Sequence, residues 1–157
     1  MKTLLIAVGK TDAPYLRTGI DDYLQRIPHY TPFEMCVIPD VKNSRALTQE
    51  QQKIAEGRLI LALVEPSDFL ALLDEGGRQF SSRQFADYFL KMSASGAKRL
   101  VFVIGGPYGF SPDVYARANQ KISLSPMTFS HQMVRLIFVE QLYRAQTIIK
   151  GEPYHHD

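Results

Sequence analysis

Three short segments of this 157-residue chain carry residue types that suit ligand binding, and each follows a short apolar run. They are residues 73–77, 105–109 and 124–129. Glycines in the first two let the backbone approach a ligand closely. The third combines apolar residues with hydroxyls, which suits a flat aromatic group such as adenine held by backbone hydrogen bonds. Any one of these segments, taken alone, is better explained as a turn after a strand.

Other familiar site patterns are poorly supported. The glycines at 105–109 do not follow the Gly-x-Gly-x-x-Gly pattern, and the sequence has no Gly-x-x-x-x-Gly-Lys-Ser/Thr motif. One cysteine and four histidines give no zinc-ligand spacing, so no metal is expected. Cys36 sits in an apolar run and is interpreted as a core residue.

The elements that must position these segments alternate between strands and helices. Apolar runs predict strands at residues 3–8, 33–38, 69–73, 100–104 and 121–124. Helical spacing and capping patterns predict helices at 14–27, 48–64, 81–95, 112–119 and 131–149. This alternation predicts an α/β fold with a mainly parallel sheet flanked by helices, in a single domain over residues 1–157. Ligands bind outside the carboxyl ends of such strands, where the three segments lie.

Composition narrows the class of protein further. Apolar residues make up 45% and charged residues 22%, which is typical of a globular chain. The net charge of +2 neither requires nor excludes a nucleic-acid partner. No apolar run reaches the ~20 residues of a membrane span, and the first residues are too short for a signal peptide. With a single cysteine, these features favour a cytoplasmic protein.

Several strings in combination carry a family resemblance. They are Leu-Ile-Ala-Val-Gly-Lys at 5–10, Ile-Gly-Gly-Pro-Tyr-Gly at 104–109, Leu-Ser-Pro-Met-Thr-Phe-Ser-His-Gln-Met-Val-Arg at 124–135, Glu-Gln-Leu-Tyr-Arg-Ala at 140–145 and Pro-Tyr-His at 153–155. Together they resemble the ribosomal large subunit pseudouridine methyltransferase H family, of the SPOUT class. The resemblance covers essentially the whole chain.

The resemblance implies a fold, a partner and a reaction. It implies a C-terminal deep trefoil knot, a homodimer, and S-adenosyl-L-methionine bound in the knot. It implies methylation of N3 of pseudouridine 1915 in 23S rRNA within the assembled 70S ribosome. The cofactor contacts it implies are Leu73, Gly105, Leu124, Ser125, Pro126, Met127, Thr128 and Phe129. The surplus apolar surface of the 131–149 helix also favours a subunit interface.

Methyl transfer to this nitrogen is an in-line displacement in which the N3 proton must also leave. The site must therefore align the acceptor and either accept a proton or stabilise the charge that develops. The candidates for these roles are His131, Arg135, Tyr143, Arg144, Tyr154 and His155. His131 and Arg135 are four residues apart and are expected on one helix face. Neutral His155 is a candidate proton acceptor.

Each candidate also has a structural interpretation. Arg135 and Arg144 could lie on a solvated helix face, with Glu140 and Arg144 as a plain ion pair. His131 could be a polar residue at a helix start, Tyr143 could be interface packing, and the tail could be disordered.

Two residues depart from the family pattern. Relatives carry a small or acidic residue in place of Tyr108, and a basic residue in place of His156.

Two other functions are alternatives to RNA methylation. One alternative is a non-catalytic, ribosome-associated RNA-binding protein that retains the knotted fold. The other is a nucleotide-binding α/β regulator. Binding of S-adenosylmethionine and methyl incorporation into ribosomes separate the three.

Overall fold

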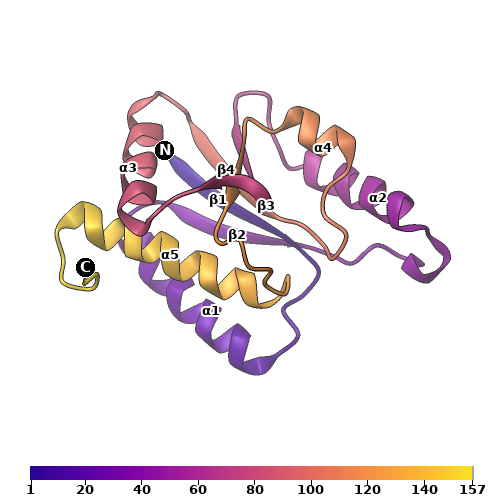
Figure 1. The fold of residues 1–157 in the computed structure, drawn as a ribbon, viewed down its shortest axis with the longest axis horizontal. Coiled ribbons are helices and arrows are strands. Elements are labelled where there is room, and N and C mark those ends of the chain that lie inside the picture. The colour runs from indigo at the N-terminus through magenta and orange to yellow at the C-terminus, as the bar shows by residue number, and fades with distance from the viewer. Residues whose placement is uncertain (157) are drawn as a thin grey trace.

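A computed structural model describes residues 1–156, in which five parallel strands form one sheet (Figure 1). The strands are β1 (Lys2–Val8), β2 (Phe33–Ile38), β3 (Phe69–Gln79), β4 (Arg99–Ile104) and β5 (Gln120–Ser123). Their order across the sheet is β2-β1-β4-β3-β5, with every neighbouring pair parallel. The α/β class with a parallel sheet is therefore confirmed.

Four α-helices connect the strands, a fifth follows β5, and together they cover both faces of the sheet. They are α1 (Pro14–Arg26), α2 (Gln49–Leu61), α3 (Ser82–Ala94), α4 (Pro112–Arg117) and α5 (Met133–Lys150), with 3-10 turns at Ile27–His29 and Ser44–Ala46. Helices α1, α3 and α5 lie on one face, and α2 and α4 lie on the other (Figure 1). The three layers leave the carboxyl ends of the strands to be lined by loops.

Capping boxes open helices α2 and α3, where capping patterns in the sequence predict two helix starts. Thr48 accepts from the backbone N–H of Gln51 while the Gln51 side chain accepts from the backbone N–H of Thr48. Ser81 and Gln84 make the same reciprocal pair at the start of α3. These bonds satisfy N–H groups that the first helical turn leaves without partners, which explains where the two helices begin.

Strand β3 continues beyond its predicted end. The sequence predicts a turn at Gly76 and Gly77, but the strand runs to Gln79 and resumes pairing with β5 after an irregularity between Leu73 and Arg78. A Cβ on Gly77 would lie 2.5 Å from the backbone nitrogen of Ile122. The glycine therefore permits a close approach of two backbones within the sheet, which is what a glycine inside a strand marks.

Candidate functional site

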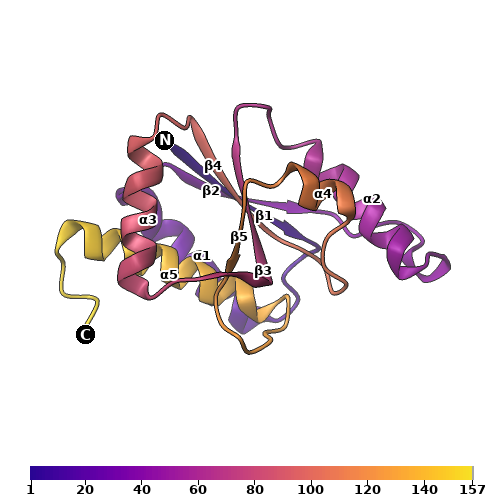
Figure 2. The same ribbon diagram turned by 45° about the horizontal axis from the view of Figure 1, so that its top comes forward.

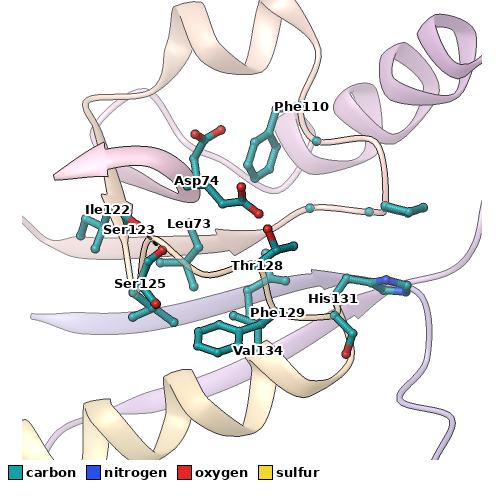
Figure 3. Close-up of a pocket in the computed structure, with 18 of the residues that line it drawn as sticks. Leu73, Asp74, Phe110, Ile122, Ser123, Ser125, Thr128, Phe129, His131 and Val134 are labelled. Atoms are coloured by element: carbon teal, nitrogen blue, oxygen red, sulfur yellow. Dashed lines mark hydrogen bonds between the residues drawn. The ribbon is translucent and has the colours of Figure 1, made fainter. Parts of the chain in front are cut away.

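A pocket of about 460 Å³ opens at the carboxyl ends of β3, β4 and β5. Leu73 ends the regular part of β3, Gly105 follows β4, and the loop after β5 closes the third side (Figure 3). This volume lies within the range of small-molecule sites. The three segments proposed from the sequence thus converge on one pocket.

Most of the expected cofactor contacts line this pocket. Those that do are Leu73, Gly105, Leu124, Ser125, Met127, Thr128 and Phe129. Pro126 is exposed and is not among the lining residues. The walls are largely apolar, since Ile104, Phe110 and Val134 also contribute. An apolar pocket with a few hydroxyls suits an adenine ring.

The glycine loop after β4 rests on helix α2. A Cβ on Gly106 would meet the carboxylate of Glu56 at 2.7 and 2.8 Å, and a Cβ on Gly57 would meet Ser111 Oγ at 2.5 Å. Glu56 is buried, and Gln52 donates to its Oε2 at 3.1 Å. Burial raises the pKa of Glu56. A buried carboxylate therefore supports the back of the pocket loop.

His131 and Arg135 occupy different environments. His131 lines the pocket, at the opposite end from Ile122 and Ser123 (Figure 3). Helix α5 begins at Met133, two residues after His131. His131 therefore lies before the helix, and the prediction that it shares a helix face with Arg135 is wrong. Arg135 is fully buried, which also excludes the solvated-face interpretation.

The guanidinium of Arg135 joins the end of β1 to the start of α5. It donates to Gly9 O at 2.6 Å, to Val8 O at 2.7 Å and to Thr11 Oγ1 at 3.1 Å. Its Nε donates to His131 O at 3.1 Å. Burial lowers the pKa of Arg135. The structure thus gives Arg135 the geometry of a buried brace that holds the His131 backbone.

The other four catalytic candidates gather at the far end of α5. The Tyr154 ring packs edge-on against Tyr143, with centroids 4.8 Å apart, and Arg144 stacks on Tyr154 at 4.8 Å. Arg144 also pairs with Glu140 one turn earlier, and it donates to Nδ1 of His155 at 3.2 Å. The tail through His155 is therefore packed, which excludes the disordered-tail interpretation for these residues.

Hydrogen bonds fix the tyrosines of this cluster. Tyr154 donates to Glu140 Oε1 at 3.1 Å, so it accepts from the Tyr23 hydroxyl, also at 3.1 Å. Tyr30 donates to Glu152 at 2.7 Å. Burial, followed by the bond with Tyr23, raises the pKa of Tyr154. The hydroxyl of Tyr154 is therefore a proton donor at neutral pH, not a base.

The bond from Arg144 constrains His155. A guanidinium only donates, so Nδ1 of His155 must accept, and the proton of the neutral ring lies on Nε2. The single lone pair of that tautomer is then already engaged. His155 must release Arg144 before it can accept a proton from a substrate.

Within one chain, this cluster is separated from the pocket. Val134 lines the pocket, and Arg144 lies ten residues further along α5, which corresponds to about 15 Å of helix. Figure 2 shows the segment that follows α5 at the opposite end of this helix from the loop that leaves β5. A surface hollow between the two regions is lined by Gly19, Asp22, Tyr23, Leu136, Ile137 and Glu140.

Several lining residues and partners were not expected from the sequence. Asp74 and Glu75 lie in the proposed segment 73–77, but they were not named as contacts, whereas Phe110 and Val134 lie outside the three segments and also line the pocket. Tyr23 is 131 residues from Tyr154 in sequence, so no spacing could have joined them. Among residues 1–156, no cluster of three His, Cys, Asp or Glu could hold a metal. No helix over the same range is suited to crossing a membrane.

Comparisons with known proteins agree with this architecture. Residues 1–155 match the family described as "Predicted SPOUT methyltransferase". The chain is 59% identical over 157 residues to the ribosomal RNA large subunit methyltransferase H of Parabacteroides distasonis, covering all of both chains. It is 58% identical over 156 residues to the protein of that name from Christiangramia forsetii, covering 99% of each, and 55% identical over the whole of both chains to that of Bacteroides thetaiotaomicron. The chain therefore belongs to the SPOUT methyltransferase family.

Proposed function

We propose that this protein methylates N3 of pseudouridine 1915 in 23S rRNA, on the assembled ribosome, with S-adenosyl-L-methionine as methyl donor. The observation that carries the proposal is the pocket at the strand ends, which gathers seven of the eight expected cofactor contacts. The names of the relatives support ribosomal RNA as the substrate. The trefoil knot stays a prediction, and ribosomal RNA as substrate implies a cytoplasmic location.

The pocket residues fit this donor in size and chemistry. Leu73, Leu124 and Phe129 provide apolar walls for an adenine, and the loop backbone around Met127 provides polar groups at its edge. Ser125 Oγ accepts from the Met127 N–H at 2.9 Å, and Ser123 Oγ donates to Ser125 O at 3.0 Å. These bonds hold the loop in shape. The bound donor supplies an electrophilic methyl group on a sulfonium, and the protein aligns the acceptor nitrogen with it.

The remaining chemistry falls to the cluster of Tyr143, Arg144, Tyr154 and His155. In the transfer, the new bond joins the methyl carbon to N3, the carbon–sulfur bond breaks, and the N3 proton leaves. Arg144 is a donor that can stabilise the negative charge as that proton departs, and the Tyr154 hydroxyl can do so once it releases Glu140. His155 is the proposed proton acceptor once Arg144 turns to the substrate.

A homodimer resolves the separation between the cluster and the pocket. One chain holds them about 15 Å apart along α5, which is too far for one nucleobase to touch both. The hollow beside Leu136 and Ile137 offers an apolar surface between α1 and α5. We propose that a second copy packs there and brings its tail to the first copy's pocket.

Ribosome methylation tests the proposal directly. Labelled S-adenosylmethionine is incubated with ribosomes from a strain that lacks this protein, and digestion of the 23S rRNA locates the label. We expect one labelled nucleotide, 3-methylpseudouridine. Binding of the donor without labelling would support the non-catalytic RNA-binding alternative. Preference for another nucleotide would support the regulator.

A further inference from the structure

The pocket carries acidic side chains on one rim. Asp74 and Glu75 follow Leu73 directly and both line the cavity. Among the described lining residues there is no lysine or arginine, and His131 is the remaining side chain that could carry a positive charge. A ligand in this pocket therefore meets negative charge without a fixed cation in the wall to balance it.

Asp74 is held in place by two donors. The Gly76 N–H donates to its Oδ1 at 2.8 Å, and the Tyr115 hydroxyl donates to its Oδ2 at 2.5 Å. Both carboxylate oxygens are thus used as acceptors, as an ionised group uses them. Figure 3 shows the Asp74 carboxylate above Leu73, on the side of the pocket where Phe110 lies. These two hydrogen bonds hold the Asp74 carboxylate in one position beside the cavity.

Tyr115 is itself positioned by the pocket wall. Its ring packs edge-on against Phe110, with centroids 5.7 Å apart, and Phe110 lines the cavity. Burial, followed by the hydrogen bond to Asp74, raises the pKa of Tyr115 to about 12. The hydroxyl therefore keeps its proton at neutral pH and continues to donate to Asp74. Tyr115, in α4, thereby holds the carboxylate of Asp74, in β3, in one orientation.

The two forms of the cofactor differ in charge at one atom. Resting on the proposed function, the ligand enters as a cationic sulfonium and leaves as a neutral thioether, while its adenine, ribose, amino and carboxylate groups stay the same. A fixed negative charge in the wall of the same cavity lowers the free energy of the cationic form and has little effect on the neutral one. We propose that Asp74, assisted by Glu75, makes the pocket prefer S-adenosylmethionine over S-adenosylhomocysteine, and that Tyr115 is the positioning residue for this selectivity.

Calorimetric titration with both compounds tests this preference. The protein is titrated with S-adenosylmethionine and S-adenosylhomocysteine as the unaltered chain and as Asp74→Asn, Glu75→Gln and Tyr115→Phe. Asp21→Asn, an exposed carboxylate on α1 that does not line the pocket, is the matched control. We expect Asp74→Asn to raise the Kd for S-adenosylmethionine about tenfold and that for the homocysteine less than about twofold. Tyr115→Phe should shift the ratio in the same direction by a smaller factor, and the control should not shift it.

The possible outcomes are distinguishable. If Asp74→Asn raised the Kd of both compounds by the same factor, the proposal would be overturned. Such a result would mean that the Asp74 carboxylate contacts a group that both compounds carry. An unchanged ratio in all three variants would overturn it too. Failure of the unaltered chain to bind S-adenosylmethionine at all would instead refute the proposed function. Thermal melts of each variant separate loss of binding from loss of fold.

Discussion

Replacing Arg135 distinguishes a buried brace from a catalytic group. Arg135→Met keeps the approximate volume of the side chain but removes four hydrogen bonds, including those to Val8 O and Gly9 O. Leaving a buried carbonyl without a donor costs about 1–3 kcal/mol, so losing the bonds to Val8 O, Gly9 O and His131 O costs about 3–5 kcal/mol in total. For a chain of this size each kcal/mol lowers the Tm by about 2–4 °C. We therefore expect the Tm to fall by about 10 °C.

Arg144→Met is the matched control, because its side chain is partly exposed and pairs with Glu140 across one helical turn. Such a pair contributes about 1 kcal/mol or less, so the Tm should fall by only a few degrees. Ribosome methylation well below both melting temperatures should fall about a hundredfold for Arg144→Met and much less for Arg135→Met. Circular dichroism gives the Tm. An Arg135→Met protein that melts like the unaltered chain yet fails to methylate would refute the brace interpretation.

Three further variants test the pocket support, the interface and the tail. Because burial raises the pKa of Glu56 above 4.5, its protonated form stabilises the fold at low pH, and this stabilisation is lost as the pH rises through the raised value. Glu56→Gln should therefore raise the Tm at pH 8 but not at pH 4, and a lower Tm at pH 8 would contradict this. Ile137→Asp should halve the mass in light scattering, whereas a monomeric unaltered chain would exclude the dimer. Tyr154→Phe removes the bonds to Tyr23 and Glu140, worth about 1 kcal/mol, so amide exchange in the tail should be about fivefold faster. Unchanged exchange would show that the hydroxyl does not hold the tail.

The strands and most helices could be predicted because their determinants are local. The capping boxes at Thr48 and Ser81 fix where two helices begin, and short apolar runs mark the strands. The exception was the glycine pair at Gly76 and Gly77, which is typical of a turn. Its real determinant is the approach of β5, more than 40 residues later, and no local pattern could reveal that contact.

The position of the pocket could be predicted from the sequence, but the burial and packing of the catalytic candidates Arg135 and Tyr154 could not. The carboxyl ends of parallel strands lie at one edge of a sheet, so the three segments could be placed at that edge, and the family resemblance implied Leu73, Gly105 and Phe129 as the contacts there. An arginine on a predicted helix is normally solvated, and the burial of Arg135 depends on carbonyls at Val8 and Gly9, far away in sequence. The packing of Tyr154 likewise depends on Tyr23.

The order of the strands has a consequence for how the chain is made. β1 pairs with β4 as well as with β2, and Lys2 is in register with Arg99. A nascent chain shorter than about 100 residues thus holds a largely apolar strand with one open hydrogen-bonding edge, which can pair with another chain and cause aggregation. Such high contact order predicts slow folding, and synthesis must reach β4 before the sheet can close around its first strand.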